Sequence, residues 1–515
     1  MQLFEITLVL LAIAVVLLQI ARHLRVPYPS MLALIGGCVA ALPFAPHLSI
    51  EPRLALALFV APAVMDTAFD MPPREMLRNW LPLTSLAVVL VLLTTAAVAW
   101  AGWALAGLPL AAAVALGAIV APPDAAAAAA VLREFNLPRR TMAVLQGESL
   151  LNDAVALLAF GLAVSAAVSP GNAWNTLLPR LGLAVPGGAL LGVASGVLSI
   201  RVARKVAGTL STIIVQFLVT FGTWILAERL SLSPIVAVVA LAAVAARYMP
   251  ARTSARDRVN SYAVWATVVF VLNVLAFLLM GLQARIILNQ LPAEELRHAL
   301  VFAVIVLGVV IGVRFLWVMT YGRVMRFVRS FFGPRAFAPM PPARIGVLVS
   351  WCGMRGLVTL ATAFSLPPEF PGRNVIVLSA FTVVLGTLVV QGFTIRPLIA
   401  LLRIAPDQSL DLEVAEARRA MLDAALAELA DHSGEAADAV RGEYGAARAA
   451  SSSDPTRPLT QYDNLRTLAI AAERRLLADW RRRGRIFDDT YHLLEDELDR
   501  AELHTASLGT TSLEG

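Results

Sequence analysis

Thirteen apolar segments follow one another along the first 402 residues of this chain, and most are long enough for a helix to cross a lipid bilayer. Such a crossing takes about 20 apolar residues at a rise of about 1.5 Å each. Charged residues make up only 15% of the sequence and the mean hydropathy is +0.73, whereas a soluble protein carries about 25% charged residues. We therefore predict an all-α polytopic membrane protein with about thirteen transmembrane helices, at residues 3–21, 28–48, 52–69, 80–106, 108–132, 141–168, 178–200, 208–228, 232–248, 260–284, 298–322, 345–366 and 375–402.

The loops between these segments differ in positive charge, which predicts their side of the membrane. One alternate set of loops holds nineteen arginine and lysine residues, and the other set holds six. Because cytoplasmic loops are enriched in these residues, we place the N-terminus outside and the C-terminus in the cytoplasm. The same arginines account for the net charge of +6, which in a soluble protein would suggest binding to nucleic acid. We therefore predict the lipid bilayer as partner and no nucleic acid.

The composition changes from apolar to charged near residue 404. Beyond it, acidic and basic residues alternate in two amphipathic stretches separated by a polar break at residues 451–455. We predict two domains, a transmembrane domain at 1–403 and a cytosolic helical tail at 404–515. The charge runs of the tail indicate solvated faces, with a regulatory or dimer-bracing role as the alternative.

Two carboxylates stand inside the sixth apolar segment, residues 141–168. They are Glu148 and Asp153, with Ser149 and Asn152 between them. At 100° per residue Ser149 lies under Asp153 and Glu148 under Asn152, on one helix face. A carboxylate at membrane depth costs several kcal/mol or takes up a proton. The alternative is a pair of helix–helix hydrogen bonds, but two acids within six residues favour a site for a monovalent cation or a proton.

The fifth segment is interrupted by the sequence Ala-Pro-Pro-Asp at residues 121–124. Two prolines remove two backbone donors and block a continuous helix, which frees carbonyl groups at membrane depth. Helix ends of this kind form ion sites in transporters. The alternative is a simple proline kink, but the adjacent Asp124 favours a site that includes Pro123 and Asp124.

The twelfth segment contains an arginine, Arg355, within the sequence Trp-Cys-Gly-Met-Arg-Gly at residues 351–356. Arginine stays charged at any relevant pH, so inside a membrane it needs a buried acid. Snorkelling to the interface is the alternative, but about ten residues of apolar segment flank Arg355 on either side. We predict an ion pair between Arg355 and Glu148.

The two interrupted segments lie seven segments apart. Because seven is odd, the two segments cross the membrane in opposite directions, which predicts two repeats of six helices in inverted orientation. Paired interruptions at corresponding positions of two repeats indicate the binding site of a secondary transporter. Asp66 in the third segment and Asn273 in the tenth are possible funnel or accessory residues. For both, a structural role is equally compatible with the sequence.

Five motifs, in order and spacing, resemble those of the monovalent cation:proton antiporters of the NhaP and NHE type. The resemblance runs from about residue 5 to residue 403, and the cluster at 147–153 with the distant arginine motif is its specific part. One departure is Pro123, where the family usually has a threonine. The motifs are Gly-Glu-Ser-Leu-Leu-Asn-Asp at 147–153, Ala-Pro-Pro-Asp-Ala at 121–125, the segment 270–283, the arginine motif within 350–360 and Val-Gln-Gly-Phe-Thr-Ile at 390–395.

The resemblance implies a homodimer in the inner membrane of a bacterial cell, in which a mobile core domain moves the site against a dimerisation domain. It implies that Asp153 binds a cation and a proton alternately, with Na⁺ or K⁺ held by Asp153, Ser149 and Glu148. Asn152 stands where electrogenic relatives have a second aspartate, which implies electroneutral exchange of one cation for one proton. The Glu–Arg pair of the family would be Glu148 and Arg355.

The leading hypothesis is a secondary antiporter that exchanges Na⁺ or K⁺ for H⁺ by alternating access and serves pH homeostasis. The alternative is a cation channel or a membrane sensor built on a transporter-like fold. An enzyme is not predicted, because the sequence has no Gly-x-Gly-Asp motif, no helical histidine pair for zinc and no phosphate-binding Gly-x-x-x-x-Gly-Lys-[Ser/Thr] loop. No cofactor is expected beyond the transported ions.

Overall fold

The structure is a computed structural model, and it divides into two compact units, residues 1–406 and 407–515. No strand occurs in the part of the chain that it describes, and every regular element there is helical. The described residues are 2–24, 26–40, 51–71, 78–124, 127–128, 132, 135, 137–168, 173–206, 211–248, 255–288, 292–332, 342–404, 407, 409–451, 461–483, 485, 494–495 and 497–501.

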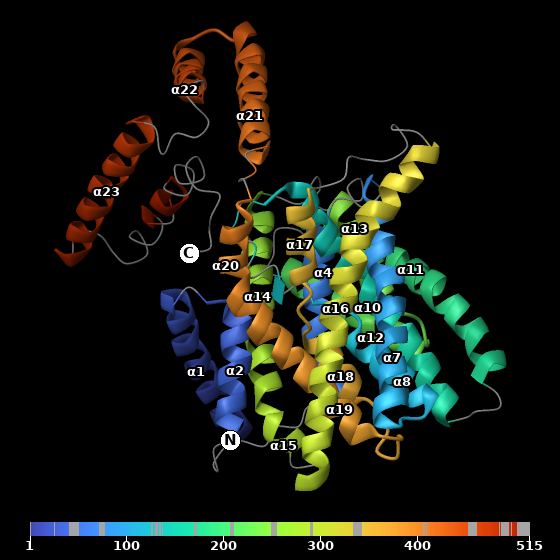
Figure 1. Ribbon diagram of the computed structural model, residues 1–515. Coiled ribbons are helices and arrows are strands. Elements are labelled where there is room, and N and C mark those ends of the chain that lie inside the picture. The colour runs from blue at the N-terminus through green and yellow to red at the C-terminus, as the bar shows by residue number, and fades with distance from the viewer. Residues whose placement is uncertain are drawn as a thin grey trace. The chain divides into compact units, whose positions relative to one another are not determined.

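The first unit is a bundle of helices that run side by side (Figure 1). Several of them are joined end to end, so that one apolar segment of the sequence contains two or three elements. The first half of the unit contains α1 (Gln2–Leu24), α2 (Tyr28–Ala40), α3 (Pro52–Ala55), η1 (Leu56–Val60), α4 (Ala61–Asp70), α6 (Trp80–Thr84), η2 (Ser85–Leu90), α7 (Val91–Ala106), α8 (Leu110–Val120) and α10 (Arg139–Val168).

The second half of the unit continues in the same manner. It contains α11 (Ala173–Val206), α12 (Ser211–Arg229), α13 (Pro234–Tyr248), α14 (Ala255–Leu282), α15 (Ala284–Leu288), α16 (Ala293–Phe332), α17 (Ala343–Trp351), α18 (Leu357–Phe364), α19 (Arg373–Gly386), η3 (Thr387–Gln391) and α20 (Gly392–Leu402). Eight helical stretches of the described chain are long and apolar enough to cross a membrane, and four shorter apolar helices accompany them.

Each of the thirteen apolar segments contains at least one of these helices, which confirms the all-helical fold. The number of crossings stays a prediction. The fifth and twelfth segments differ from the rest because their helices stop inside the segment. Helix α8 ends at Val120, directly before the two prolines, and α17 and α18 are separated by residues 352–356.

Three short π-helical segments, η1, η2 and η3, lie within the third, fourth and thirteenth predicted segments. A π-helical turn widens the helix and is common near functional sites. In η3, the hydroxyl of Thr387 accepts a hydrogen bond of 2.9 Å from the backbone N–H of Arg355. The widened turn therefore contacts the break between α17 and α18.

Two clusters of buried apolar side chains hold the first unit together. The larger cluster joins α8 to α16–α19 and includes Val144, Leu145 and Ala163 of α10. The smaller cluster contains Leu150 of α10 with Met65 of α4, Trp224 of α12 and Trp265 of α14. Because α10 contributes to both clusters, the turn that carries Glu148 to Asp153 lies between them.

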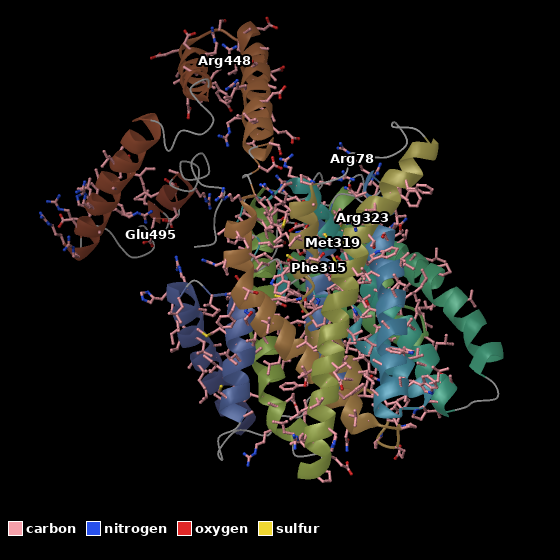
Figure 2. The ribbon with its side chains drawn as sticks, in the orientation of Figure 1. Arg78, Phe315, Met319, Arg323, Arg448 and Glu495 are labelled. Atoms are coloured by element: carbon pink, nitrogen blue, oxygen red, sulfur yellow. The ribbon has the colours of Figure 1, made fainter. Side chains whose placement is uncertain are left out.

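The second unit contains α21 (Ser409–Glu428), η4 (Leu429–Asp431), α22 (Glu435–Ser451) and α23 (Gln461–Arg482). Helices α21 and α22 form a hairpin with an ion pair between Asp423 and Arg448. Figure 2 labels Arg448 on α22. The described part of the tail is helical, as the sequence predicts. Its cytosolic location stays a prediction.

Candidate ion-binding site

Helix α10 presents the acidic cluster to the interior of the first unit. The side chains of Glu148, Asn152 and Asp153 are 1%, 0% and 6% exposed, and Ser149 is half-buried. Glu148 and Asn152 are four residues apart, as are Ser149 and Asp153, so one face of α10 carries all four. The structure therefore buries the polar cluster that the sequence places inside an apolar segment.

Glu148 forms a buried ion pair with Arg314 of α16, not with Arg355. Both carboxylate oxygens accept hydrogen bonds from the guanidinium group, at 3.0 Å for Oε2 and with Oε1 in close contact. Both side chains are 1% exposed. The predicted Glu148–Arg355 pair is thus corrected: the acid on α10 takes its partner from the eleventh apolar segment. Two-point contact of this kind is the strongest form of carboxylate–arginine pair.

The sequence contains a signal for Arg314, because this arginine lies within the predicted segment 298–322. Charged residues at membrane depth turn towards a partner in the protein. Figure 2 shows the neighbouring Phe315 with Met319 and Arg323 at intervals of four along α16, and Phe315 is 39% exposed. Arg314 is 1% exposed and faces inward, about 100° around the helix from Phe315. Neighbouring positions on this helix therefore point to different environments.

Arg355 instead joins the two broken helices to each other. Its guanidinium group donates to the carbonyl oxygens of Val120 (2.9 Å) and Ala121 (3.1 Å), and it also contacts the carbonyl of Gly353. The last carbonyl groups of a helix lack intrahelical donors and carry partial negative charge. Because the prolines end α8 at this point, Arg355 supplies both the missing donors and a positive charge.

Arg314 has the same relation to α17. Its guanidinium group donates to the carbonyl oxygen of Val349 from Nε (3.2 Å) and Nη2 (3.0 Å), in the last turn of that helix. Each broken helix therefore ends against an arginine. The two arginines differ in one respect: Arg314 also forms the ion pair with the Glu148 carboxylate.

Asp124, from the fifth segment, packs against the start of α18. Its backbone N–H donates to the carbonyl of Met354 (2.7 Å), and a Cβ atom on Gly356 would stand 1.5 Å from Asp124 Oδ2. Gly356 directly precedes α18, so the carboxylate meets the positive end of that helix. Only glycine leaves room for this approach.

Asn152 connects α10 to the other break. Its side-chain amide N–H donates to the carbonyl of Pro123 at 3.1 Å, while its Oδ1 is buried without a hydrogen-bond partner in the described structure. Buried polar atoms are nearly always satisfied. Asn152 therefore offers one oxygen without a partner next to the interrupted backbone of the fifth segment. At position 123 the proline contributes a backbone carbonyl, whereas the threonine usual in the family would contribute a side-chain hydroxyl.

Asp153 is the buried carboxylate of this cluster that forms no salt bridge with any residue the structure describes. It lies within electrostatic range of Asp124. Two carboxylates close together in a dry environment cannot both stay charged without a counter-ion. This arrangement favours a bound proton or a bound cation at Asp153.

A small cavity of about 10 Å³ lies between α10 and the two breaks. Pro123, Asp124, Glu148, Ser149 and Arg314 are among its lining residues, and Asp153 is not. A volume of this size holds about one water molecule. The cavity therefore brings together most of the predicted site residues, although not the one with the predicted central role.

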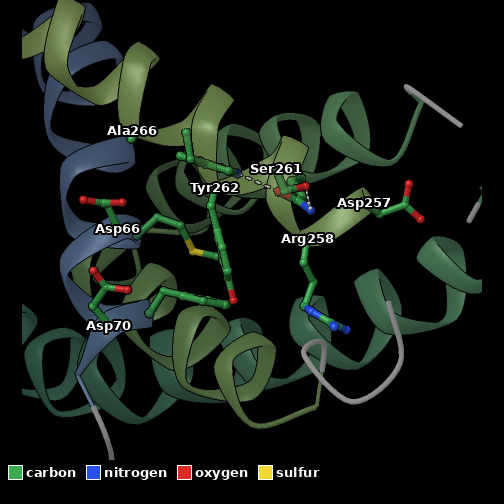
Figure 3. A pocket seen from close by; sticks show the side chains of 11 residues that line it. Asp66, Asp70, Asp257, Arg258, Ser261, Tyr262 and Ala266 are labelled. Atoms are coloured by element: carbon green, nitrogen blue, oxygen red, sulfur yellow. Dashed lines mark hydrogen bonds between the residues drawn. The ribbon is translucent and has the colours of Figure 1, made fainter. Parts of the chain in front are cut away.

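The two accessory residues lie elsewhere. Asp66 lines a larger cavity of about 290 Å³ between α4, α12 and α14, shown in Figure 3. Asn273 is half-buried on α14 and is not among the residues that line that cavity. The wall residues Met65 and Trp265 share an apolar cluster with Leu150 of α10.

Comparison with known proteins decides the family. Residues 8–401 match the family model described as "Sodium/hydrogen exchanger, transmembrane". The chain belongs to this exchanger family. The match covers the whole apolar part of the sequence and confirms the resemblance based on its motifs.

Several relatives support the same assignment. An uncharacterised Na⁺/H⁺ exchanger of Mycobacterium tuberculosis is 32% identical over 464 residues, which are 85% of this chain and 82% of the relative. An antiporter of Bacillus pumilus named for exchange of sodium, potassium, lithium and rubidium for H⁺ is 31% identical over 448 residues, covering 83% and 66% of the two chains. The exchanger is therefore a multi-pass membrane protein and a cation/proton antiporter, as the sequence predicts.

A solved structure agrees on the fold. The sodium proton antiporter MjNhaP1 of Methanocaldococcus jannaschii, determined at pH 8, superimposes with a TM-score of 0.58 at 16% identity. The superposition covers 78% of this exchanger and 99% of that chain. The homodimer and the inverted repeats stay predictions.

Proposed function

We propose that this exchanger carries out electroneutral antiport, in which Asp153 binds either one monovalent cation or one proton. The observation that carries the proposal is the contrast between two buried carboxylates on one turn of α10. Glu148 is neutralised by Arg314, whereas Asp153 forms no salt bridge with a described residue. Asp153 is thus the group whose charge is available to an exchangeable ion.

The remaining groups supply the oxygen ligands and the fixed charges around Asp153. The free Oδ1 of Asn152 and the Ser149 hydroxyl on α10, and the Asp124 carboxylate at the start of α18, are the donors for a hard cation. Asn152 carries no charge, so one cation replaces one proton. Glu148 has a structural role in this proposal, because Arg314 occupies both of its oxygens.

Coupling follows from the cost of an unpaired charge in a low-dielectric interior. A carboxylate that has lost both ions is expensive to move through the membrane core, whereas the neutral form with a proton or a cation is not. The site therefore changes sides when it is occupied. Alternating exposure would involve the mobile part built around the two broken helices, in a homodimer with the C-terminus in the cytoplasm.

The test uses the full chain in proteoliposomes with an imposed pH difference and with Na⁺, K⁺, Li⁺ and Rb⁺ as alternative cations. The exchanger should move protons only when one of these cations is present, and Asp153→Asn should stop this flux while leaving the protein folded. Cation-coupled proton flux in the Asn variant would contradict the proposal.

Voltage separates electroneutral from electrogenic exchange. With the membrane potential clamped by K⁺ and valinomycin, the rate of Na⁺/H⁺ exchange should not change with potential. A steep voltage dependence would show that unequal numbers of cations and protons are exchanged in each cycle. A flux of cations without protons would instead indicate the channel that the sequence leaves as the alternative.

A further inference from the structure

The larger cavity between α4, α12 and α14 has aromatic walls. Phe69, Tyr262 and Trp265 line it, together with the side chain of Gln216. The indole N–H of Trp265 donates to Gln216 Oε1 at 2.7 Å, and the rings of Phe69 and Tyr262 meet edge to face at 6.1 Å. These contacts hold the rings in place within the protein itself.

The charges around the cavity favour a cation. Asp66, Asp70, Asp257 and Arg258 line it, so these four side chains together contribute a net charge of −2. Asp66 and Asp70 are one turn apart in the last turn of α4, where the free carbonyl groups already carry partial negative charge. Figure 3 shows both aspartates on α4, with the Tyr262 ring between that helix and Arg258.

The walls do not suit a bare metal cation. Na⁺ and K⁺ need a close shell of oxygen atoms. The lining oxygens of Asp66, Asp70, Gln216 and Ser261 are spread around a volume of about 290 Å³, and the rings between them add none. An alkylated ammonium ion has different needs, because its methyl groups contact ring faces while its charge is attracted by the ring electrons. The carboxylates of Asp66 and Asp70, which line the cavity, then neutralise that charge.

We propose that this cavity binds a small methylated ammonium ion, of the class of choline or tetramethylammonium. The volume of about 290 Å³ is near the lower end of small-molecule pockets, which fits a cation of this size. Tyr262 is 50% exposed, so one wall is open to an incoming ligand. The site is separate from Asp153, which does not line the cavity.

The proposal is tested by equilibrium binding of radiolabelled choline to the purified full chain. The wild-type protein should bind choline saturably, with one site per chain, and tetramethylammonium should displace it. The neutral analogue 3,3-dimethylbutan-1-ol has the shape of choline without its charge, so it should not compete. Absence of saturable choline binding, or equal competition by the neutral analogue, would overturn the proposal.

Two variants separate the contributions of the ring and the charge. Tyr262→Leu keeps an apolar wall without the ring, and Asp66→Asn keeps the shape without the charge. Each should weaken choline binding roughly tenfold. The matched controls are Phe393→Leu, which removes an exposed ring elsewhere, and Glu369→Gln, which removes an exposed carboxylate elsewhere; both should leave binding unchanged.

A further variant distinguishes this cavity from the transport site. Asp153→Asn should bind choline as the wild type does, since the two sites share no lining residue, and this result does not depend on whether the protein exchanges cations. Loss of choline binding in Asp153→Asn would place the ligand at the transport site and overturn the proposal. Monodisperse elution and an unchanged melting temperature establish that each variant is folded, and if Tyr262→Leu fails to fold, Asp66→Asn and the neutral analogue still decide.

Discussion

At the scale of single residues, the ion pair between Glu148 and Arg314 carries the largest expected stability effect. Removing one partner leaves a buried charge without compensation, which typically costs about 3–5 kcal/mol. Glu148→Gln and Arg314→Ala should therefore each lower the melting temperature of the purified protein. The double variant should lose less than the sum of the two single losses, because the second change removes the stranded charge.

The control for this cycle pairs Glu148 with Arg355, which bonds to carbonyl oxygens instead. The coupling energy between Glu148 and Arg314 should clearly exceed that between Glu148 and Arg355. Equal coupling energies, or additive effects for Glu148 and Arg314, would show that this contact contributes nothing specific.

Gly356 gives a second prediction at the same scale. In Gly356→Ala the new methyl group would overlap Asp124 Oδ2 at 1.5 Å, so α18 must move away from the break. We expect a lower melting temperature and loss of exchange. Combining it with Asp124→Gly, which removes the overlapping side chain, should restore the melting temperature but not the exchange.

Gly222→Ala is the matched control, because nothing lies within 4 Å of the position its Cβ would take on α12. That variant should melt and exchange like the wild type. A Gly356→Ala protein with normal exchange would show that Asp124 does not need its position against α18.

The residues of the site could be found from the sequence, whereas their partners could not. Charged groups inside apolar segments are visible one segment at a time, which is why Glu148, Asp153 and Arg355 stand out. Arg314 and Arg355 both lie well inside predicted apolar segments. Which of them reaches Glu148 depends on how α10, α16 and α17 pack together, and helical periodicity contains no information about that contact.

At the scale of helices, Arg355 is expected to hold the two broken elements together. Its planar guanidinium group reaches Val120, Ala121 and Gly353 at once, and a lysine ammonium group cannot reproduce that geometry. Arg355→Lys should therefore reduce exchange strongly although the charge is kept. The exposed Arg344→Lys is the control, and equal exchange rates in the two variants would contradict this role.

The breaks themselves could be predicted because proline and glycine act locally. Pro122 and Pro123 end α8 at Val120, and the loss of backbone donors follows from their chemistry. The contact of the π-helical turn η3 with the second break could not be predicted, since it joins the N–H of Arg355 to the Thr387 hydroxyl of another segment. Local chemistry thus determines where a helix stops, and tertiary contacts determine what satisfies the freed groups.

At the scale of the whole molecule, the division into two units predicts that transport does not require the tail. All the buried ionisable groups of the candidate site lie in the first unit, residues 1–406. A chain that ends near residue 405 should therefore insert and exchange cations for protons, with a changed rate or pH dependence. The measurement is proteoliposome exchange by the truncated protein against the full chain, and a folded, dimeric but wholly inactive truncation would assign the tail to the mechanism.

The central claim is that a cation and a proton compete for Asp153, and proton release on cation binding tests it most directly. The purified protein is placed in weakly buffered solution, Na⁺ or K⁺ is added, and the released protons are measured over a series of pH values. The wild type should release up to one proton per chain with a saturable cation dependence, and Asp153→Asn should release none. Equal proton release by the wild type and Asp153→Asn would show that the competition takes place at another group.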